Sequence, residues 1–233
     1  MKATTRTEYI QAEEHLQTDK VWKFAGIDKF LFNMIIKGTW IFTIPLDVDA
    51  MKSALKKLLS YYPHLTGRIK NKDRICLTNE GVPFMVEEKP ELSIKDLHNN
   101  KDVMKDISAG LTPARIKQGR DALLGIKITK VKDGSVVRIE GSHVCLDGDS
   151  FYTMVYNWGR LCQNQDIEDP VLDQSLLPVP GELSKEQCIQ AAIQRGWKKI
   201  SILSVITLLP PLLSGAYKER TSSFYFSPAA LGE

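Results

Sequence analysis

The segment that most constrains the fold is a strand, a tight turn, a second strand and a helix in direct succession. Residues 123–131 read LLGIKITKV, residues 135–143 read SVVRIEGSH, and Lys132-Asp133-Gly134 separates them. Alternating β-branched residues predict two strands, and an Asp-Gly pair between them predicts a hairpin turn. Apolar residues then recur at helical spacing, which predicts a helix capped by Asp149 or Ser150. The stripe consists of Phe151, Val155, Trp158 and Cys162.

A candidate site lies at the junction between the second strand and this helix. Side chains alternate between the two faces of a strand, so His143 extends the apolar row formed by Val137, Ile139 and Gly141. The sequence continues to Asp147 and Gly148. We expect the glycine to permit a tight turn that leaves the histidine beside a helix N-terminus.

The remaining elements are predicted from local pattern. The segment at 46–62 has one apolar helical face, with Asp47 or Asp49 as its cap and Pro63 after its end. We also expect strands at 40–44, within 67–77 and at 81–86. Loops and short helices are expected over 92–121. A further helix is expected from Ser184 to about Lys199, and it opens with a Ser184–Gln187 capping box.

Composition excludes several classes of protein. The chain has 233 residues and 43% hydrophobic residues, so it can bury a core without disulfides. Its 31 basic and 28 acidic residues are mixed along the sequence, and this disfavours nucleic-acid binding. The four cysteines are widely spaced, which indicates reduced thiols in a cytoplasmic protein and no metal site. The first 17 residues lack the apolar stretch of a secretory signal.

One apolar run needs a separate explanation. Residues 200–217 read ISILSVITLLPPLLSGAY. A membrane-spanning helix needs about 20 apolar residues, and Pro210-Pro211 removes backbone donors from the middle of this shorter run. We therefore expect a buried connection or a surface for another domain in preference to a membrane segment.

Three readings of the His143–Asp147 pair remain open from the residues alone. A neutral imidazole can act as general base and take a proton from an acceptor hydroxyl or amine. Cys145 and His143 could instead form a nucleophile pair, although two residues in one extended strand are poorly placed to meet. The pair could also be a strand-end histidine and a helix-capping aspartate without chemistry. No partner cluster supports a site at the other histidines, which are His15, His64 and His98.

Further motifs give the chain a resemblance to the BAHD acyltransferases, which transfer acyl groups from coenzyme A to small-molecule alcohols and amines. Residues 55–69, LKKLLSYYPHLTGRI, are similar to the family's helix and "YYPLAGRL" stretch, and residues 142–158 match its "SH-x-x-x-DG" motif. Further similarities occur, in order along the chain, at Gly81-Val82-Pro83-Phe84, residues 170–178 and Phe224-Tyr225-Phe226-Ser227, and Gly26-Ile27-Asp28 fits an early motif of the family loosely. The matches run from about residue 24 to the last residue.

The resemblance implies an α/β (α+β) fold like that of chloramphenicol acetyltransferase, with a mixed β-sheet flanked by helices. It implies that His143 is the general base and that Asp147 is structural, turned away to pair with an arginine, with Gly148 permitting the turn. Transfer would be direct, without a covalent acyl-enzyme. Acyl-CoA would be a co-substrate, and no cofactor would be bound permanently.

The chain also departs from the family pattern. Members are about twice as long, and the Asp-Phe-Gly-Trp-Gly motif of their second half is absent here. We therefore expect an N-terminal domain at 1–181, a crossover at 182–222 and the start of a second, similar domain at 223–233. Most coenzyme A contacts would lie in a complementary C-terminal domain, so residues 1–233 alone should have little activity.

Two alternatives to an acyltransferase are a non-catalytic binding or scaffold half and a condensation-type domain. The condensation domains of peptide synthetases carry two histidines where this chain has Ser142-His143, which disfavours them.

Overall fold

A computed structural model describes residues 5–14, 21–24, 28–29, 31–99, 107–172 and 184–196. The chain divides into two compact units, Met1–Val171 and Leu172–Glu233. The domain boundaries expected at 181 and 222 lie outside the described residues.

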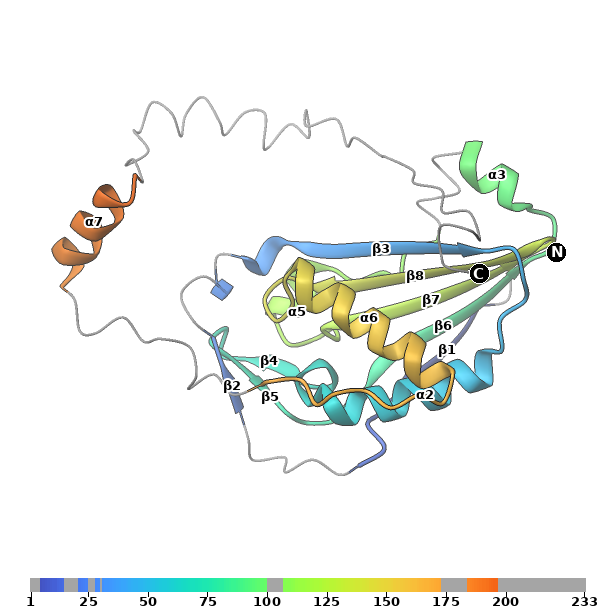
Figure 1. Cartoon of the computed structure of the whole chain (residues 1–233), viewed down its shortest axis with the longest axis horizontal. Coiled ribbons are helices and arrows are strands. Elements are labelled where there is room, and N and C mark those ends of the chain that lie inside the picture. Colours follow the sequence, from blue (N-terminus) through green and yellow to red (C-terminus); the bar gives the residue numbers. More distant parts are fainter. Residues whose placement is uncertain are drawn as a thin grey trace. The chain divides into compact units, whose positions relative to one another are not determined.

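The first unit is built on a five-stranded mixed sheet (Figure 1). Strands β6 and β7 are parallel, and every other neighbouring pair is antiparallel. In spatial order the strands are β1 (Thr5–Ile10), β6 (Val82–Lys89), β7 (Leu124–Val131), β8 (Gly134–Ser142) and β3 (Ile35–Phe42).

The predicted hairpin is present, with β7 and β8 paired from Val131–Gly134 to Leu124–Gly141. Gly134 of the turn is the first residue of β8 and does not have a positive φ. A Cβ there would lie 2.1 Å from the backbone oxygen of Phe42. Glycine is thus required because a neighbouring strand passes close to the turn.

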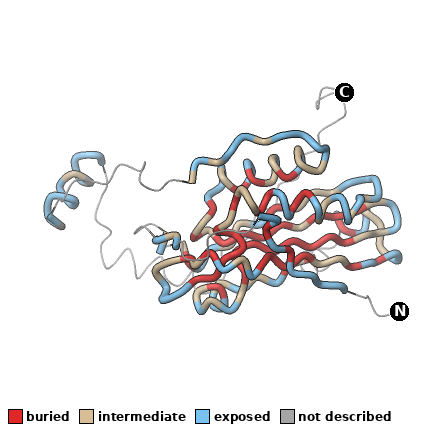
Figure 2. The backbone as a smooth tube through the Cα atoms, turned by 90° about the horizontal axis from the view of Figure 1, so that it is seen from below, coloured by how far each residue is buried: buried red, intermediate tan, exposed pale blue. Residues whose placement is uncertain are grey.

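Helices α2 (Val48–Tyr61) and α6 (Gly148–Cys162) cover the same face of this sheet (Figure 1). Asp47 caps α2 by accepting from the amides of residues 49 and 50, and the helix ends before Pro63 as predicted. The indole N–H of Trp158 donates to the Met51 carbonyl at 3.1 Å and ties the two helices together. Figure 2 shows that burial is concentrated in the strands and the inward helix faces.

The core under these helices follows the alternation predicted for the second strand. Val137 and Ile139 lie in the main cluster, together with Phe151, Met154 and Trp158 of α6. A second cluster lies beside it around a three-stranded sheet. In spatial order this sheet consists of β2 (Val21–Lys23), β5 (Arg74–Cys76) and β4 (Arg68–Lys70). The unit also contains short helices, which are η1 (Leu31–Asn33), η2 (Pro63–Thr66), α3 (Ile94–Asn99) and α5 (Pro113–Lys117).

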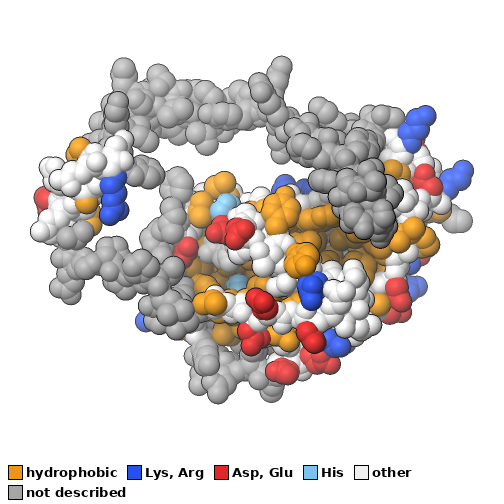
Figure 3. All heavy atoms as spheres, in the orientation of Figure 1, with side chains coloured by type: hydrophobic (Ala, Val, Ile, Leu, Met, Phe, Trp, Pro, Cys, Tyr) orange, Lys and Arg blue, Asp and Glu red, His pale blue; other side chains and the backbone are white. Residues whose placement is uncertain are grey.

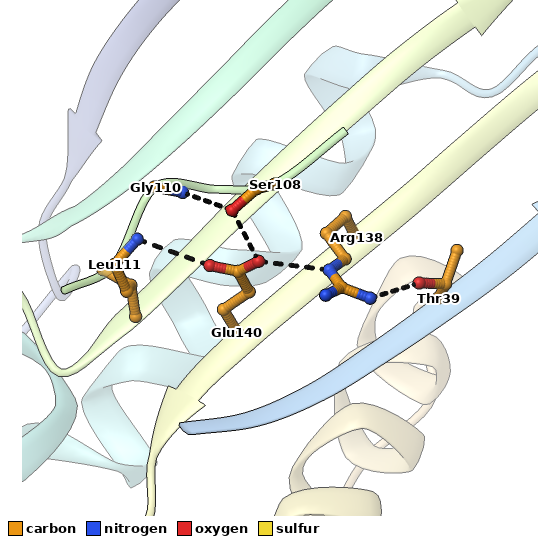
Figure 4. A network of polar contacts seen from close by, with 6 residues as sticks. All are labelled: Thr39, Ser108, Gly110, Leu111, Arg138 and Glu140. Atoms are coloured by element: carbon orange, nitrogen blue, oxygen red, sulfur yellow. Dashed lines mark hydrogen bonds and ion pairs between the residues drawn. The ribbon is translucent and has the colours of Figure 1, made fainter. Parts of the chain in front are cut away.

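Side chains that point to the other face of β8 form a polar network (Figure 4). The fully buried Glu140 accepts from Ser108 Oγ at 2.9 Å, from the Leu111 amide at 3.4 Å and from Arg138 Nε at 3.2 Å. Arg138 also donates to Thr39 Oγ1 on β3 at 2.7 Å. A buried carboxylate is tolerated only when such partners satisfy it, so this network fixes the 108–111 segment against the sheet.

Helix α7 (Lys185–Gln194) is the described element of the second unit. It begins with the predicted capping box, since the Gln187 amide donates to Ser184 Oγ and the Ser184 amide donates to Gln187 Oε1. The apolar run at 200–217, the end of the 170–178 match and the strand expected from residue 222 lie outside the described residues. Among the described helices, none is long and apolar enough to cross a membrane.

Candidate active site

His143 is the first residue after β8, which ends at Ser142, one residue earlier than predicted. Its backbone N–H donates to the carbonyl of Met34 at 3.0 Å, so the chain at this point is still held against the residue before β3. The histidine is therefore attached to the rigid sheet on one side and followed by a short turn on the other. Such anchoring is what a catalytic side chain needs to keep its orientation.

The two ring nitrogens of His143 differ in their surroundings. The Nδ1 atom is buried and has no hydrogen-bond partner among the described residues, whereas the residue as a whole is partly exposed. This leaves Nε2 as the candidate nitrogen for contact with a reactant. A neutral imidazole in this setting accepts a proton at Nε2 when Nδ1 carries the ring hydrogen.

Asp147 is the N-cap of α6, and the prediction of Asp149 or Ser150 was wrong. Its Oδ1 atom accepts from the Ser150 amide at 2.8 Å and from Ser150 Oγ at 2.7 Å, and its own amide donates to Ser150 Oγ at 2.9 Å. These bonds, with the nearby His143 contributing, hold the pKa of the Asp147 carboxyl below its usual range. A reciprocal capping box of this kind satisfies amides that a helix start leaves open.

The roles expected for Gly148 and Asp147 differ from those seen in the structure. Gly148 does not have a positive φ, and a Cβ at this position would meet no atom within 4 Å, so the turn does not require glycine. No arginine of the described residues pairs with the exposed Asp147 carboxylate. Within this part of the chain, the aspartate is held by Ser150 alone.

Cys145 does not have the properties of a nucleophile. Its thiol donates to the Ser142 carbonyl at 3.4 Å. Burial, with a smaller contribution from the charge of Asp28, raises the pKa of the Cys145 thiol. Because the thiolate is the reactive form, this environment disfavours the cysteine–histidine alternative.

Of the other histidines, the structure describes the side chain of His64. His64 is almost completely buried, with its ring 4.7 Å from that of Trp22, and burial lowers its pKa to about 4. His15 and the side chain of His98 lie outside the described part of the chain. Among the described residues no cluster of three His, Cys, Asp or Glu side chains could hold a metal.

Sequence reasoning missed two neighbours of the site. Ser150 was considered only as a cap, whereas it completes the capping box with Asp147. Met34 was not considered, because only strand pairing brings it beside His143. A serine three residues after an aspartate is a sequence signal that could have identified the role of Ser150. No local pattern identifies Met34 as a neighbour of His143.

The family model described as the Transferase family matches residues 1–194, a range that includes this strand-end histidine and the capped helix after it. The chain belongs to this family. Its expected place among the BAHD acyltransferases is confirmed. The BAHD acyltransferase DCR of Arabidopsis thaliana is 25% identical over 141 residues, which are 55% of this chain and 29% of that protein.

Solved structures confirm the expected chloramphenicol-acetyltransferase-like fold. Vinorine synthase matches with a TM-score of 0.64 and 20% identity, over 91% of this chain and 60% of its own. TRI101 of F. sporotrichioides, solved with coenzyme A and T-2, matches with a TM-score of 0.53 and 14% identity, over 64% of this chain and 42% of its own. This member of the family thus spans about 60% of the vinorine synthase chain and less than a third of the Arabidopsis protein.

Proposed function

We propose that the protein transfers an acyl group from acyl-CoA to the hydroxyl or amine of a small molecule, with His143 as general base. The observation that supports this proposal is the setting of His143, whose Nδ1 is buried while the residue is partly exposed directly after strand β8. Membership of the BAHD acyltransferases supports the reaction class.

The proposed step needs one histidine and no enzyme nucleophile. Nε2 of His143 takes the proton of the acceptor O–H or N–H while the acceptor atom attacks the thioester carbonyl carbon. The tetrahedral intermediate then collapses, the C–S bond breaks, and the proton on Nε2 passes to the departing sulfur of coenzyme A. Base assistance of this kind contributes about 10²–10⁴-fold to a rate.

Asp147 acts on this step through position. It holds the start of α6 by its capping box with Ser150, four residues after the base. Its carboxylate is exposed, and the proposed proton path does not pass through it. We assign Asp147 the role of a positioning residue, and Gly148 no role beyond the first turn of the helix.

The proposal includes a complementary C-terminal domain. Residues 1–181 would form the N-terminal domain, 182–222 the crossover and 223–233 the start of a second domain. That domain would supply most contacts to coenzyme A and the donors that stabilise the tetrahedral oxyanion. The match to only 60% of the vinorine synthase chain supports the proposal of a complementary domain.

The test replaces the base in the complete protein. We expect His143→Ala and His143→Gln to lower kcat/KM with acetyl-CoA and an accepted alcohol at least 100-fold, measured as thiol release. His15→Ala is the matched control, since no partner cluster accompanies that histidine in the sequence. Turnover within a few-fold of wild type in both His143 variants, with unchanged circular dichroism, would contradict the proposed chemistry.

A non-catalytic binding module makes the opposite prediction. Such a protein would bind acyl-CoA equally well with and without His143 and would release no thiol with any acceptor. Residues 1–233 expressed alone should release thiol far more slowly than the complete protein. Comparable rates would show that a second domain is not needed.

A further inference from the structure

Met34 and His143 are neighbours just beyond one end of the β3–β8 ladder. The last pairs of that ladder are Ile36 with Gly141 and Ile35 with Ser142. The His143 N–H donates to the Met34 carbonyl at 3.0 Å, while the Met34 N–H donates to the Leu31 carbonyl at 3.0 Å. The backbones of Met34 and His143 are therefore in direct contact at the point where the strand pairing ends.

Met34 is an exposed apolar group at this position. Its side chain is 48% exposed, whereas most large apolar residues of the unit are buried. Apolar side chains also lie next to it in the chain, since Phe32 is buried and its ring meets Phe24 edge-on at 5.4 Å. Figure 3 shows hydrophobic side chains gathered on the same face as exposed histidine atoms.

We propose that Met34 contacts the apolar part of the reactant bound at His143 and thereby selects reactants that carry an alkyl or aromatic group next to the reacting atom. This inference rests on the proposed function and names the substrate class for it. A thioether side chain suits the role because it is flexible and polarisable and adapts to ligands of different shape. Contact with a reactant would cover an apolar side chain that otherwise meets water.

The apolar group could belong to the acceptor or to the acyl chain, and two substrate series separate these sources. In the first, acetyl-CoA is held constant and the acceptor is ethanol, butanol or hexanol. In the second, one accepted alcohol is held constant and the donor is acetyl-, butanoyl- or hexanoyl-CoA. One methylene in an apolar pocket changes selectivity by roughly tenfold or more, so the series that meets Met34 should show a steep dependence on chain length.

Three substitutions in the complete protein test the contact. Met34→Ala and Met34→Gln should lower kcat/KM for the longest reactant of the sensitive series about tenfold relative to the shortest. Met34→Leu should retain the wild-type preference, because it keeps apolar volume. Ile44→Ala is the matched control, since Ile44 is 59% exposed beyond the far end of β3. An unchanged chain-length preference in both Met34→Ala and Met34→Gln would overturn the inference.

A binding measurement separates this inference from the catalytic proposal. The protein has six methionines, and carbon-13 methyl labelling with Met34→Leu as reference assigns the Met34 signal. Hexanol or hexanoyl-CoA should shift that signal, whereas glycerol should not. A shift without turnover would refute the catalytic proposal and keep the apolar contact. Turnover without any shift would refute the contact and keep the catalytic proposal.

Discussion

Replacement of Asp147 by alanine should destabilise the chain through loss of one helix cap. The carboxylate accepts two hydrogen bonds from Ser150, one from its amide and one from its hydroxyl. Substituting an N-cap by alanine costs about 1 kcal/mol, within a range of roughly 0.5–2 kcal/mol. For a protein of this size such a loss lowers Tm by about 2–4 °C.

The comparison with Asp147→Asn separates the cap from the charge. Asparagine is as good an N-cap as aspartate, so Asp147→Asn should stay within a few tenths of a kcal/mol of wild type at neutral pH. The pKa of Asp147 is lowered in the folded chain by its bonds to Ser150. Its charged form therefore contributes stability above the unfolded pKa, and this contribution disappears as the pH falls through the folded pKa. The asparagine variant should lack that acid-side loss.

Urea unfolding followed by circular dichroism measures the free energy of unfolding of the wild type, Asp147→Ala and Asp147→Asn at pH 7.5 and near pH 3. Ser150→Ala is the matched variant on the other side of the capping box, and it should cost no more than Asp147→Ala. Equal destabilisation by Asp147→Asn and Asp147→Ala at pH 7.5 would refute the capping argument. It would show that the negative charge itself stabilises the fold.

Three further predictions follow from burial. Phe151 is fully buried and stacks on Trp40 with ring centroids 6.3 Å apart, so Phe151→Ala should cost about 3–5 kcal/mol in a urea titration, and Phe151→Leu clearly less. Because burial lowers the pKa of His64 to about 4, the unfolded chain binds a proton that the folded chain does not between about pH 6.5 and pH 4. Stability should therefore fall as the pH drops through this window, by at most about 1.4 kcal/mol per pH unit, and His64→Leu should remove that slope. Burial raises the pKa of Cys162 to about 11 and also raises the pKa of Cys145. Both thiols should therefore react with iodoacetamide at pH 7.5 at least a hundredfold more slowly than free cysteine, whose pKa is about 8.5. Reaction rates near that of free cysteine would refute the burial of these thiols.

Much of the first unit could be predicted from local pattern. The hairpin at 123–143, the helix that ends before Pro63 and the helix that follows Gly148 all carry strong periodicity. The apolar faces of these elements pack into the core, while their opposite faces meet water or polar partners. Errors occurred at the ends of elements, where β8 stops one residue before His143 and Asp147 caps α6.

Hydrogen-bond competition explains the capping error. Asp147, Asp149 and Ser150 are all good N-cap residues when each is considered alone. In the folded chain Asp147 and Ser150 satisfy each other's open groups, which no single residue at this helix start can do. The choice depends on the path of the chain after β8.

Local sequence patterns specify the hairpin, the helix after it and the spacing of His143 and Asp147, because periodicity and turn chemistry act over a few residues. Which residues surround these elements depends on the packing of the folded chain. The register of β3 against β8 places Met34 beside His143, and the order of the strands brings Glu140 against the 108–111 segment. These neighbours are about 30 to 110 residues apart in the chain. Contacts over such distances arise from packing of whole elements, for which no short pattern in the sequence carries a signal.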